Sequence, residues 1–233
     1  MNIDETVSRI IGKERTGRIV REAFREYDID GALGTVEAIG KAKESRFCID
    51  DRNRFVYCNL VRWLHADERM KAIHPVTGRE IAGRLDCGIY LGGSTGTGKS
   101  LAIGVMADYG RLCGFRMWFG CDDGAATWRV IRSDAICDVY AESGTVRKYG
   151  DAQILCVDDF GTEPEVSSYM GNRVDVMRQL VESRGDRRDR ISIVVSNLPL
   201  CGGVKARYGD RVQSRLYGMC NYFKLEGKDR RLP

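Results

Sequence analysis

The sequence predicts a three-layer α/β domain built on a parallel five-stranded sheet, and three observations predict it. Short apolar runs alternate with stretches of helical periodicity, as in β-α-β units. The runs lack polar alternation, which indicates a sheet buried on both faces. A glycine-rich loop follows the first run and precedes a helix-like stretch, and ligands of such sheets bind beyond the carboxyl ends of the strands.

Residues 1–83 differ in texture from the rest and predict a small helical N-terminal segment. Met1–Lys43 is charged, with apolar residues at helical spacing. They are Val7, Ile10, Ile11, Ile19, Val20, Ala23 and Phe24. Phe47–Met70 has the same periodicity, and His74–Gly78 is a predicted turn. We therefore divide the chain into this segment, residues 1–83, which is a candidate for binding a partner, and a core, residues 84–233.

Five apolar runs in the core are the predicted strands, with helices between most of them. They are Cys87–Leu91, Phe115–Phe119, Ile154–Asp158, Ile191–Ser196 and Tyr222–Leu225. The stretch Leu101–Ala107 suits a buried helix after the first strand. Little chain follows the last strand, so we expect no full helical lid domain.

The loop after the first predicted strand has the pattern G-x-x-x-x-G-K-[ST]. Its glycines permit positive φ, and successive backbone N–H groups at a helix N-terminus hold a polyphosphate. Lys99 would reach the β- and γ-phosphates, and the Ser100 hydroxyl would ligate Mg²⁺. This pattern indicates a P-loop site for ATP and Mg²⁺. The predicted nucleotide-binding residues of this loop are Gly93, Ser94, Thr95, Gly96, Thr97, Gly98, Lys99, Ser100 and Leu101.

Two acids end the third predicted strand, as in a Walker B motif. Asp158 would hold Mg²⁺, which favours hard oxygen ligands. Asp159 would orient or deprotonate the attacking water. Glu163 lies close in sequence and would be able to share that task.

Asn197 follows the fourth predicted strand, where its amide would contact both the γ-phosphate and the water. The alternative is that Asn197 caps a turn before Pro199.

Arg211 and Arg215 are four residues apart and share one helix face. We expect neither to reach the ATP of its own subunit, so one would act on a neighbour's ATP as an arginine finger. The alternative is a pair of surface arginines.

Composition narrows the class of protein. The 233 residues are 43% hydrophobic, enough for a real core, and the net charge of +4 is too small to prove a nucleic-acid partner. The stretch from Lys205 to Arg231, however, contains eight Lys or Arg and only three Asp or Glu, so this part of the chain is locally basic. The nine cysteines never form C-x-x-C and indicate reduced thiols, so we expect a cytoplasmic protein with no membrane segment.

A basic and aromatic segment between the second and third predicted strands is the candidate contact for single-stranded DNA, because basic groups track phosphates and aromatic rings stack on bases. Its residues are Trp128, Arg129, Arg132, Tyr140, Arg147, Lys148 and Tyr149. The alternative is an ordinary amphipathic helix pair with core aromatics. The run Arg184–Arg190 is also basic, but its interspersed acids favour a solvated loop.

These pieces, in this order, resemble the AAA+ ATPases of the DnaC/IstB group, which includes bacterial and phage helicase loaders. The resemblance covers about Gly88–Arg231 and rests on the strings GIYLGGSTGTGKS, ILCVDDFGTEP, YMGNRVDVMRQLVESR, VVSNL, YGDRVQSRL and FKLEGKDRR. It implies Walker A roles for Lys99 and Ser100, and Walker B roles for Asp158 and Asp159.

The resemblance also implies that Asn197 is sensor 1 and that Arg215 is the arginine finger, with Arg211 a second basic position. Arg231 falls where related chains have a basic residue near the nucleotide. Many AAA+ proteins carry Glu where Asp159 stands. The resemblance therefore does not decide whether Asp159 supports ATP turnover.

The implied partners are a DnaB-type replicative helicase, single-stranded DNA and other copies of the chain in an ATP-dependent homo-oligomer. The alternatives are an IstB-like helper of a DNA transposase, a non-hydrolysing ATP-gated adaptor and a small-molecule P-loop kinase. The transposase helper differs from a helicase loader in its protein partner. The adaptor differs in that it does not hydrolyse ATP, and the kinase differs in that it transfers phosphate to a small molecule rather than to water.

Overall fold

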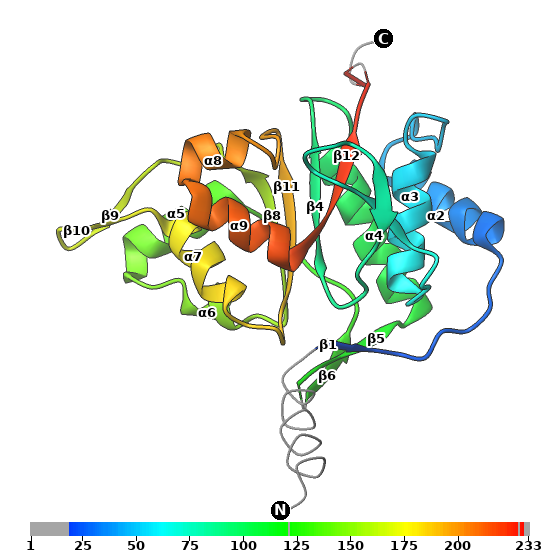
Figure 1. Cartoon of the computed structure of the whole chain (residues 1–233), viewed down its shortest axis with the longest axis horizontal. Coiled ribbons are helices and arrows are strands. Elements are labelled where there is room, and N and C mark those ends of the chain that lie inside the picture. The colour runs from blue at the N-terminus through cyan, green and yellow to red at the C-terminus, as the bar shows by residue number, and fades with distance from the viewer. Residues whose placement is uncertain (1–18, 121, 228, 231–233) are drawn as a thin grey trace, which may run out of the picture.

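The computed structural model describes residues 19–120, 122–227 and 229–230, and these residues form three layers around a central sheet (Figure 1). As described, the sheet has five strands, all parallel, in the order β12-β4-β11-β8-β7. The strands are β4 (Gly88–Gly93), β7 (Val130–Arg132), β8 (Ile154–Phe160), β11 (Ile191–Ser196) and β12 (Cys220–Leu225). The predicted fold class is confirmed.

Helices cover both faces of this sheet (Figure 1). One face carries α2 (Ile29–Lys43), α3 (Arg54–Leu64) and α4 (Lys99–Cys113). The other carries α5 (Ser133–Ser143), α6 (Arg147–Asp151), α7 (Val176–Gly185), α8 (Gly203–Tyr208) and α9 (Asp210–Met219). Within the described ranges, no helix combines the length and the apolar character needed to cross a membrane.

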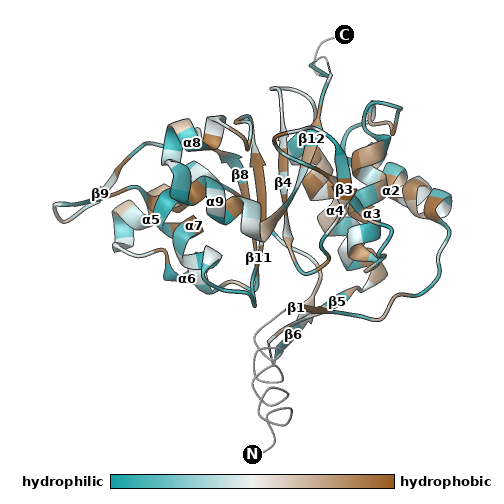
Figure 2. Ribbon diagram, viewed as in Figure 1, coloured by the Kyte–Doolittle hydropathy of each residue, from teal (hydrophilic) through white to brown (hydrophobic). Residues whose placement is uncertain are grey.

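The central strands are apolar on both sides, as Figure 2 shows. In β11, Ile191 and Ile193 join the hydrophobic cluster that includes α4, whereas Val194 joins the cluster on the opposite face. In β4, Leu91 and Tyr90 divide in the same way. Successive side chains of a strand point to opposite faces, so a strand between two helix layers carries apolar residues on both faces.

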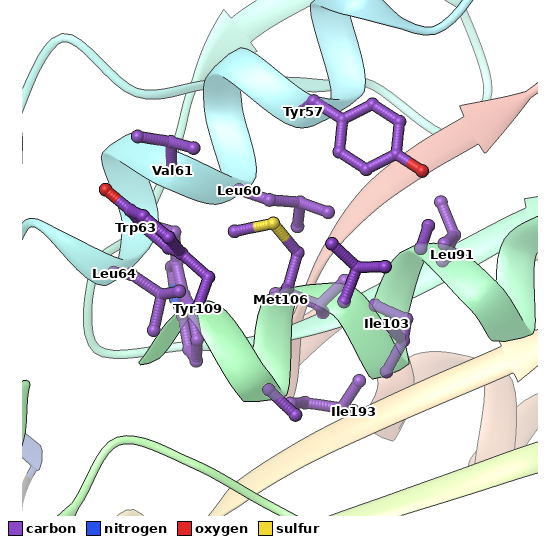
Figure 3. Close-up of a cluster of buried hydrophobic side chains, with 14 of the residues drawn as sticks. Tyr57, Leu60, Val61, Trp63, Leu64, Leu91, Ile103, Met106, Tyr109 and Ile193 are labelled. Atoms are coloured by element: carbon purple, nitrogen blue, oxygen red, sulfur yellow. The ribbon is translucent and has the colours of Figure 1, made fainter. Parts of the chain in front are cut away.

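Helix α3 packs directly on α4 (Figure 3). Leu60, Val61 and Leu64 of α3 lie against Met106 and Tyr109 of α4, and all five side chains are buried. The predicted helical periodicity of Phe47–Met70 is therefore confirmed over α3. Because this N-terminal helix shares one hydrophobic cluster with the sheet, it contributes to the same core.

The second predicted strand, Phe115–Phe119, does form a strand, but it does not belong to the parallel sheet. The strand β5 (Arg116–Phe119) forms a separate antiparallel sheet with β1 (Ile19–Arg21) and β6 (Asp122–Ala125). Met117 and Phe119 are buried, whereas Arg116 and Trp118 are exposed. This alternation is typical of a strand with one covered face. The parallel sheet instead uses the short edge strand β7.

The helical prediction also fails over Ile19–Phe24, where the described chain is the strand β1 followed by residues without regular secondary structure. β-branched Ile19 and Val20 suit a strand. Arg21 holds it in place by donating hydrogen bonds to the backbone oxygens of Trp63 and of Leu64 (3.2 Å), at the end of α3. Val7, Ile10 and Ile11 lie outside the described residues. The domain boundary stays a prediction.

Two hairpins complete the structure. The predicted turn His74–Gly78 is confirmed, because it joins β2 (Lys71–Ile73) to β3 (Glu80–Ala82). The strands β9 (Ser167–Tyr169) and β10 (Asn172–Val174) form an arm that extends away from the helices (Figure 1).

Residues 186–190 form the predicted loop between α7 and β11, but Arg184 lies in α7 and is not solvated. Its side chain is only 2% exposed, and its Nε donates to Ser192 Oγ at 2.9 Å. Its terminal nitrogens donate at 2.6–3.1 Å to the backbone oxygens of Tyr149, Gly150, Ala152 and Ile191. Burial lowers the pKa of Arg184 to about 10, so the group stays charged at neutral pH. One guanidinium thereby joins α7, β11 and the connection from α6 to β8.

We expect Arg184→Met to lower the free energy of unfolding by about 3–5 kcal/mol, because several buried carbonyls lose their donor. The measurement is urea unfolding followed by circular dichroism. Arg188→Met is the matched control, since Arg188 is exposed, and its effect should stay within about 0.5 kcal/mol. Equal stability of the two variants would contradict a structural role for Arg184.

Candidate nucleotide-binding site

The glycines of the loop between β4 and α4 occupy conformations that other residues rarely adopt. Gly93, Gly96 and Gly98 have φ values of 145°, 78° and 89°. A Cβ atom on Gly93 would lie 2.0 Å from the Leu225 backbone oxygen of the neighbouring strand β12. The loop can therefore pass close to β12 only because Gly93 lacks a side chain. Gly98 ends the loop and caps α4.

Lys99 is the first residue of α4, and its side chain is only 7% exposed. Its ammonium donates to the Gly93 and Ser94 backbone oxygens at 2.9 and 2.7 Å, and to Asn197 Oδ1 at 2.7 Å. The lysine is therefore anchored at the loop and reaches the tip of β11. Cations in this position can neutralise the charge of a bound polyphosphate.

Ser100 and Asp158 lie on facing elements and touch. The Ser100 hydroxyl donates to Asp158 Oδ1 at 3.0 Å. Asp158 is 8% exposed, and its Oδ1 also accepts the Asp159 backbone N–H at 2.9 Å. A hydroxyl and a carboxylate are the hard oxygen ligands that Mg²⁺ prefers. These two side chains fit the predicted magnesium ion.

A β-bulge in β8 separates the roles of its two acids. Val157 pairs with Val194 and Phe160 pairs with Ser196, so two residues of β8 oppose one residue of β11. Asp159, inside the bulge, has a φ of 54°, an uncommon value for a residue with a side chain. Bulges re-aim side chains, often next to active sites. Here the bulge lets Asp158 face Ser100 while Asp159 lines the nucleotide cavity.

Asn197 does not cap the turn that follows β11. The Leu198 backbone N–H donates to Ser196 Oγ at 3.0 Å, so Ser196 performs that task. The Ser196 hydroxyl donates in turn to the Phe160 backbone oxygen at 2.5 Å, which joins the tips of β11 and β8. The Asn197 side chain is thereby left to face Lys99.

Asp159 shares its carboxylate with an arginine that the sequence did not single out for this role. Arg132 ends β7, and its guanidinium lies 3.2 Å from Asp159 Oδ2. The same guanidinium contacts Asp134 at 2.7 Å, and the two acids raise the pKa of Arg132, with Asp134 the larger cause. Because β7 pairs with β8, with Arg132 opposite Asp158, an edge strand too short to predict delivers this cation to the site.

Glu163 is placed differently from expectation. Its side chain is fully buried, its Oε2 accepts the Gly161 backbone N–H at 2.9 Å, and its Oε1 accepts the Tyr208 hydroxyl. This carboxylate therefore faces α8 and is not placed to share the orientation of water at the cavity. That prediction is wrong, because the loop turns Glu163 inward.

The cavity at the loop has a volume of about 340 Å³. Beyond Thr95–Leu101, Asp159 and Asn197, it is lined by residues for which the sequence predicted no role in nucleotide binding, namely Glu44, Arg46, Phe47, Asn53, Tyr57, Leu225 and Arg230. They come from the connection between α2 and α3, from α3 and from the end of the chain. A cavity of about 380 Å³ between α6 and α7 is slightly larger. Its described lining contains no residue of the glycine loop, so we assign the nucleotide to the smaller one.

Arg211 and Arg215 lie on α9 and contact acids of the neighbouring helix region. Arg215 lies 2.5 Å from Asp186, and Arg211 lies 3.7 Å from Glu182. Among the described residues that line the cavity, neither arginine appears. This placement agrees with the expectation that they do not reach the nucleotide of their own subunit. Arg231 lies outside the described residues.

The proposed DNA contact is wrong at two of its three aromatic residues, whereas Tyr149 is only half-buried and stays a prediction. Trp128 is 6% exposed and packs edge-on against Trp63, with ring centroids 6.1 Å apart. Tyr140 is 7% exposed in the cluster under α5 and α7. These rings are core residues and cannot stack on bases. Arg129, Arg147 and Lys148 are exposed, so the basic part stays a prediction.

Comparison with known proteins identifies the fold. No known family profile matches the chain, and no curated protein is significantly similar in sequence. The chain is similar to a protein of Streptococcus pyogenes serotype M3 that is provisionally described as a primosome component. The TM-score is 0.53, with 16% identity, covering 78% of this chain and 83% of that chain.

The chain is also similar to domain III of the Thermotoga maritima replication initiation protein DnaA. The TM-score is 0.52, with 16% identity, covering 79% of this chain and 67% of that chain. At such identities the likeness shows the fold alone. The chain has an α/β P-loop NTPase fold of the type found in AAA+ domains.

We expect Gly96→Ala to raise the Kd for an ATP analogue about tenfold, because a left-handed φ costs a residue with a Cβ about 1–2 kcal/mol. The new Cβ would also meet the Asp229 carboxyl at 2.0 Å, although that side chain can move. Fluorescence titration with a labelled analogue and Mg²⁺ measures the change. Gly104→Ala in α4 is the control, with no atom within 4 Å of its Cβ, and its affinity should not change.

We expect Arg132→Ala to raise ATP turnover, by about fivefold at most, because an exposed ion pair holds Asp159 only weakly. The carboxylate would then be free to orient the attacking water. Steady-state phosphate release measures this, with Arg129→Ala as the control that keeps the parent rate. A tenfold decrease would instead mean that Arg132 itself binds the phosphates.

Proposed function

We propose that the chain binds and hydrolyses Mg-ATP and acts in DNA replication as a loader of a DnaB-type helicase. The observation that carries the ATPase part is that Lys99 bonds to Asn197 while the adjacent Ser100 bonds to Asp158, next to the cavity at the glycine loop. Four residues from three separated motifs meet there, which a chance glycine turn does not explain. The replication part rests on the motif strings shared with the DnaC/IstB group.

The loop and α4 would bind the polyphosphate through backbone N–H groups and the Lys99 ammonium. Ser100 and Asp158 would hold Mg²⁺, which supplies charge neutralisation and orients the phosphate oxygens. Leu101 lies at the cavity wall beside the start of α4. These residues would bind the substrate but would not break a bond.

Asp159 is the candidate for orienting and deprotonating the attacking water. It lies at the cavity on the same strand as Asp158, and Asn197 lies opposite, next to Lys99. The Asn197 amide would contact the γ-phosphate and that water. Asp carries one methylene fewer than Glu, so Asp159 depends on the bulge to extend toward the phosphate.

Arg215 would complete the site of a neighbouring copy in an ATP-dependent homo-oligomer, with Arg211 beside it on the same helix. Their absence from the described lining of the cavity of their own chain supports this assignment over a role in cis. An arginine finger stabilises the charge that develops on the transferred phosphoryl group. ATP between subunits would therefore make assembly depend on nucleotide.

Single-stranded DNA would contact the exposed basic residues Arg129, Arg147 and Lys148 through its phosphates. With Trp128 and Tyr140 buried, such binding would be mainly electrostatic and would weaken strongly with salt. The segment of residues 1–83 is the candidate surface for the helicase.

The deciding experiment is a mass measurement of the chain with a DnaB-type helicase and single-stranded DNA, with and without ATP. An ATP-dependent complex with the helicase supports loading. A complex with a transposase instead supports the IstB-like helper. Complex formation without turnover supports a non-hydrolysing adaptor, and phosphate transfer to a metabolite supports a kinase.

We expect specific ATPase activity to rise with protein concentration, because each site would need an arginine from a second copy. Arg215→Ala should lower the rate at high concentration about a hundredfold or more, while ATP affinity is retained. Phosphate release across a dilution series measures both. Arg116→Ala, on β5, is the control. A rate per molecule that is constant on dilution and unchanged in Arg215→Ala would contradict the trans arginine.

A further inference from the structure

The residues that follow the bulge of β8 are fastened to helix α8. The Phe160 ring stacks on the Tyr208 ring, with centroids 4.6 Å apart and an interplanar angle of 25°. The Tyr208 hydroxyl donates to the Glu163 carboxylate. Tyr208 and Glu163 are 3% and 4% exposed. One tyrosine thus binds both ends of the short loop after Asp159.

The Glu163 carboxylate is a fully satisfied buried charge. Besides the Tyr208 hydroxyl, it accepts the Gly161 backbone N–H at 2.9 Å, and the Arg207 guanidinium lies 3.5 Å away. Arg207 also donates to the Glu163 backbone oxygen at 3.2 Å. Burial raises the pKa of Tyr208, and the charge of Glu163 raises it further, so the phenol keeps the proton that it donates. A buried carboxylate is costly to separate from its partners, so this cluster moves as a unit.

Tyr208 also controls where α9 begins. It is the last residue of α8, and only Gly209, with a φ of 89° and a ψ of 172°, separates it from Asp210, the first residue of α9. On α9, Val212 and Leu216 are fully buried. The Gln213 amide donates to the Leu200 backbone oxygen at 2.8 Å, in the segment after Asn197. The helix that carries Arg211 and Arg215 is therefore tied to the loops behind both Asp159 and Asn197.

We propose that Glu163 and Tyr208 are positioning residues, which hold α9 so that Arg215 is presented correctly to the next subunit. This inference rests on the proposed trans arginine. The physical basis is one rigid path, from the bulge at Asp159 through Phe160 and Glu163 to Tyr208, and across a single glycine to α9. A shift of the loop behind the water-orienting acid of one subunit would change the arginine that its neighbour receives.

A mixing experiment with two inactive variants of the full chain separates this role from a general structural one. The variant that supplies the arginine, called the donor, is Asp159→Asn, which keeps Arg215 but lacks the acid. The variant whose site receives the arginine, called the acceptor, is Arg215→Ala, which keeps Asp159 but lacks the arginine. Each alone should be slow, and the equimolar mixture should recover turnover in the acceptor sites.

Tyr208→Phe is then added to the donor alone or to the acceptor alone, because it keeps the ring stack and removes only the hydroxyl. We expect the donor placement to lower the recovered turnover roughly tenfold, in the range of energetic coupling through packed networks. The acceptor placement should leave it within about twofold. Tyr109→Phe in the donor is the matched control. Tyr109, on α4, is also buried, and its hydroxyl lies 2.8 Å from His65 Nε2.

The outcomes are distinguishable. Absence of recovery with the parent donor and acceptor would overturn the trans arginine, and this proposal with it. Recovery that Tyr208→Phe lowers equally in both placements, or in neither, would overturn the positioning role alone. A donor-specific loss, measured at a temperature where both Tyr208→Phe variants remain folded, supports it.

Discussion

The register between β4 and β11 is the constraint on which the site depends. Ser196 lies opposite Gly92, so the two parallel strands end at the same level. The next residues, Gly93 and Asn197, therefore emerge side by side, and Lys99 can reach both at once. A slip of one residue would turn every side chain of the strand to the other face. The buried apolar residues on both faces of β11 oppose such a slip, so packing of the core fixes the polar geometry at the sheet edge.

The bulge in β8 adds a second constraint. Without it, strict alternation would point Phe160 to the same face as Asp158. With it, Phe160 joins the opposite hydrophobic cluster and stacks on Tyr208. The uncommon backbone conformation of Asp159 is thus maintained by burial of the next side chain. Local strain of this kind persists where the surroundings over-determine it.

Much of this arrangement could be predicted because buried parallel strands and the glycine loop have strong local patterns. The edge strand β7 could not, since three residues carry no periodicity. The strand β5 was misplaced because its run contains only one polar residue, Arg116, so the sequence does not show that Trp118 also lies on an exposed face. Trp128 was misassigned because a sequence does not show whether an aromatic ring beside arginines meets solvent or Trp63. Phe47 and Tyr57 of the cavity were missed because chain segments far from the loop bring them there.

Arg184 bears on how genetic screens of this protein would be interpreted. It stands in an arginine-rich run downstream of the Walker B acids, and its loss would abolish activity in a cell much as loss of Arg215 would. Its five donated hydrogen bonds end on Ser192 Oγ and on backbone oxygens of two chain segments, residues 149–152 and Ile191, well inside the molecule. Loss of function on substitution of Arg184 would reflect a shortage of folded protein rather than a defect in catalysis. The steady-state amount of the variant protein in the cell distinguishes these two causes.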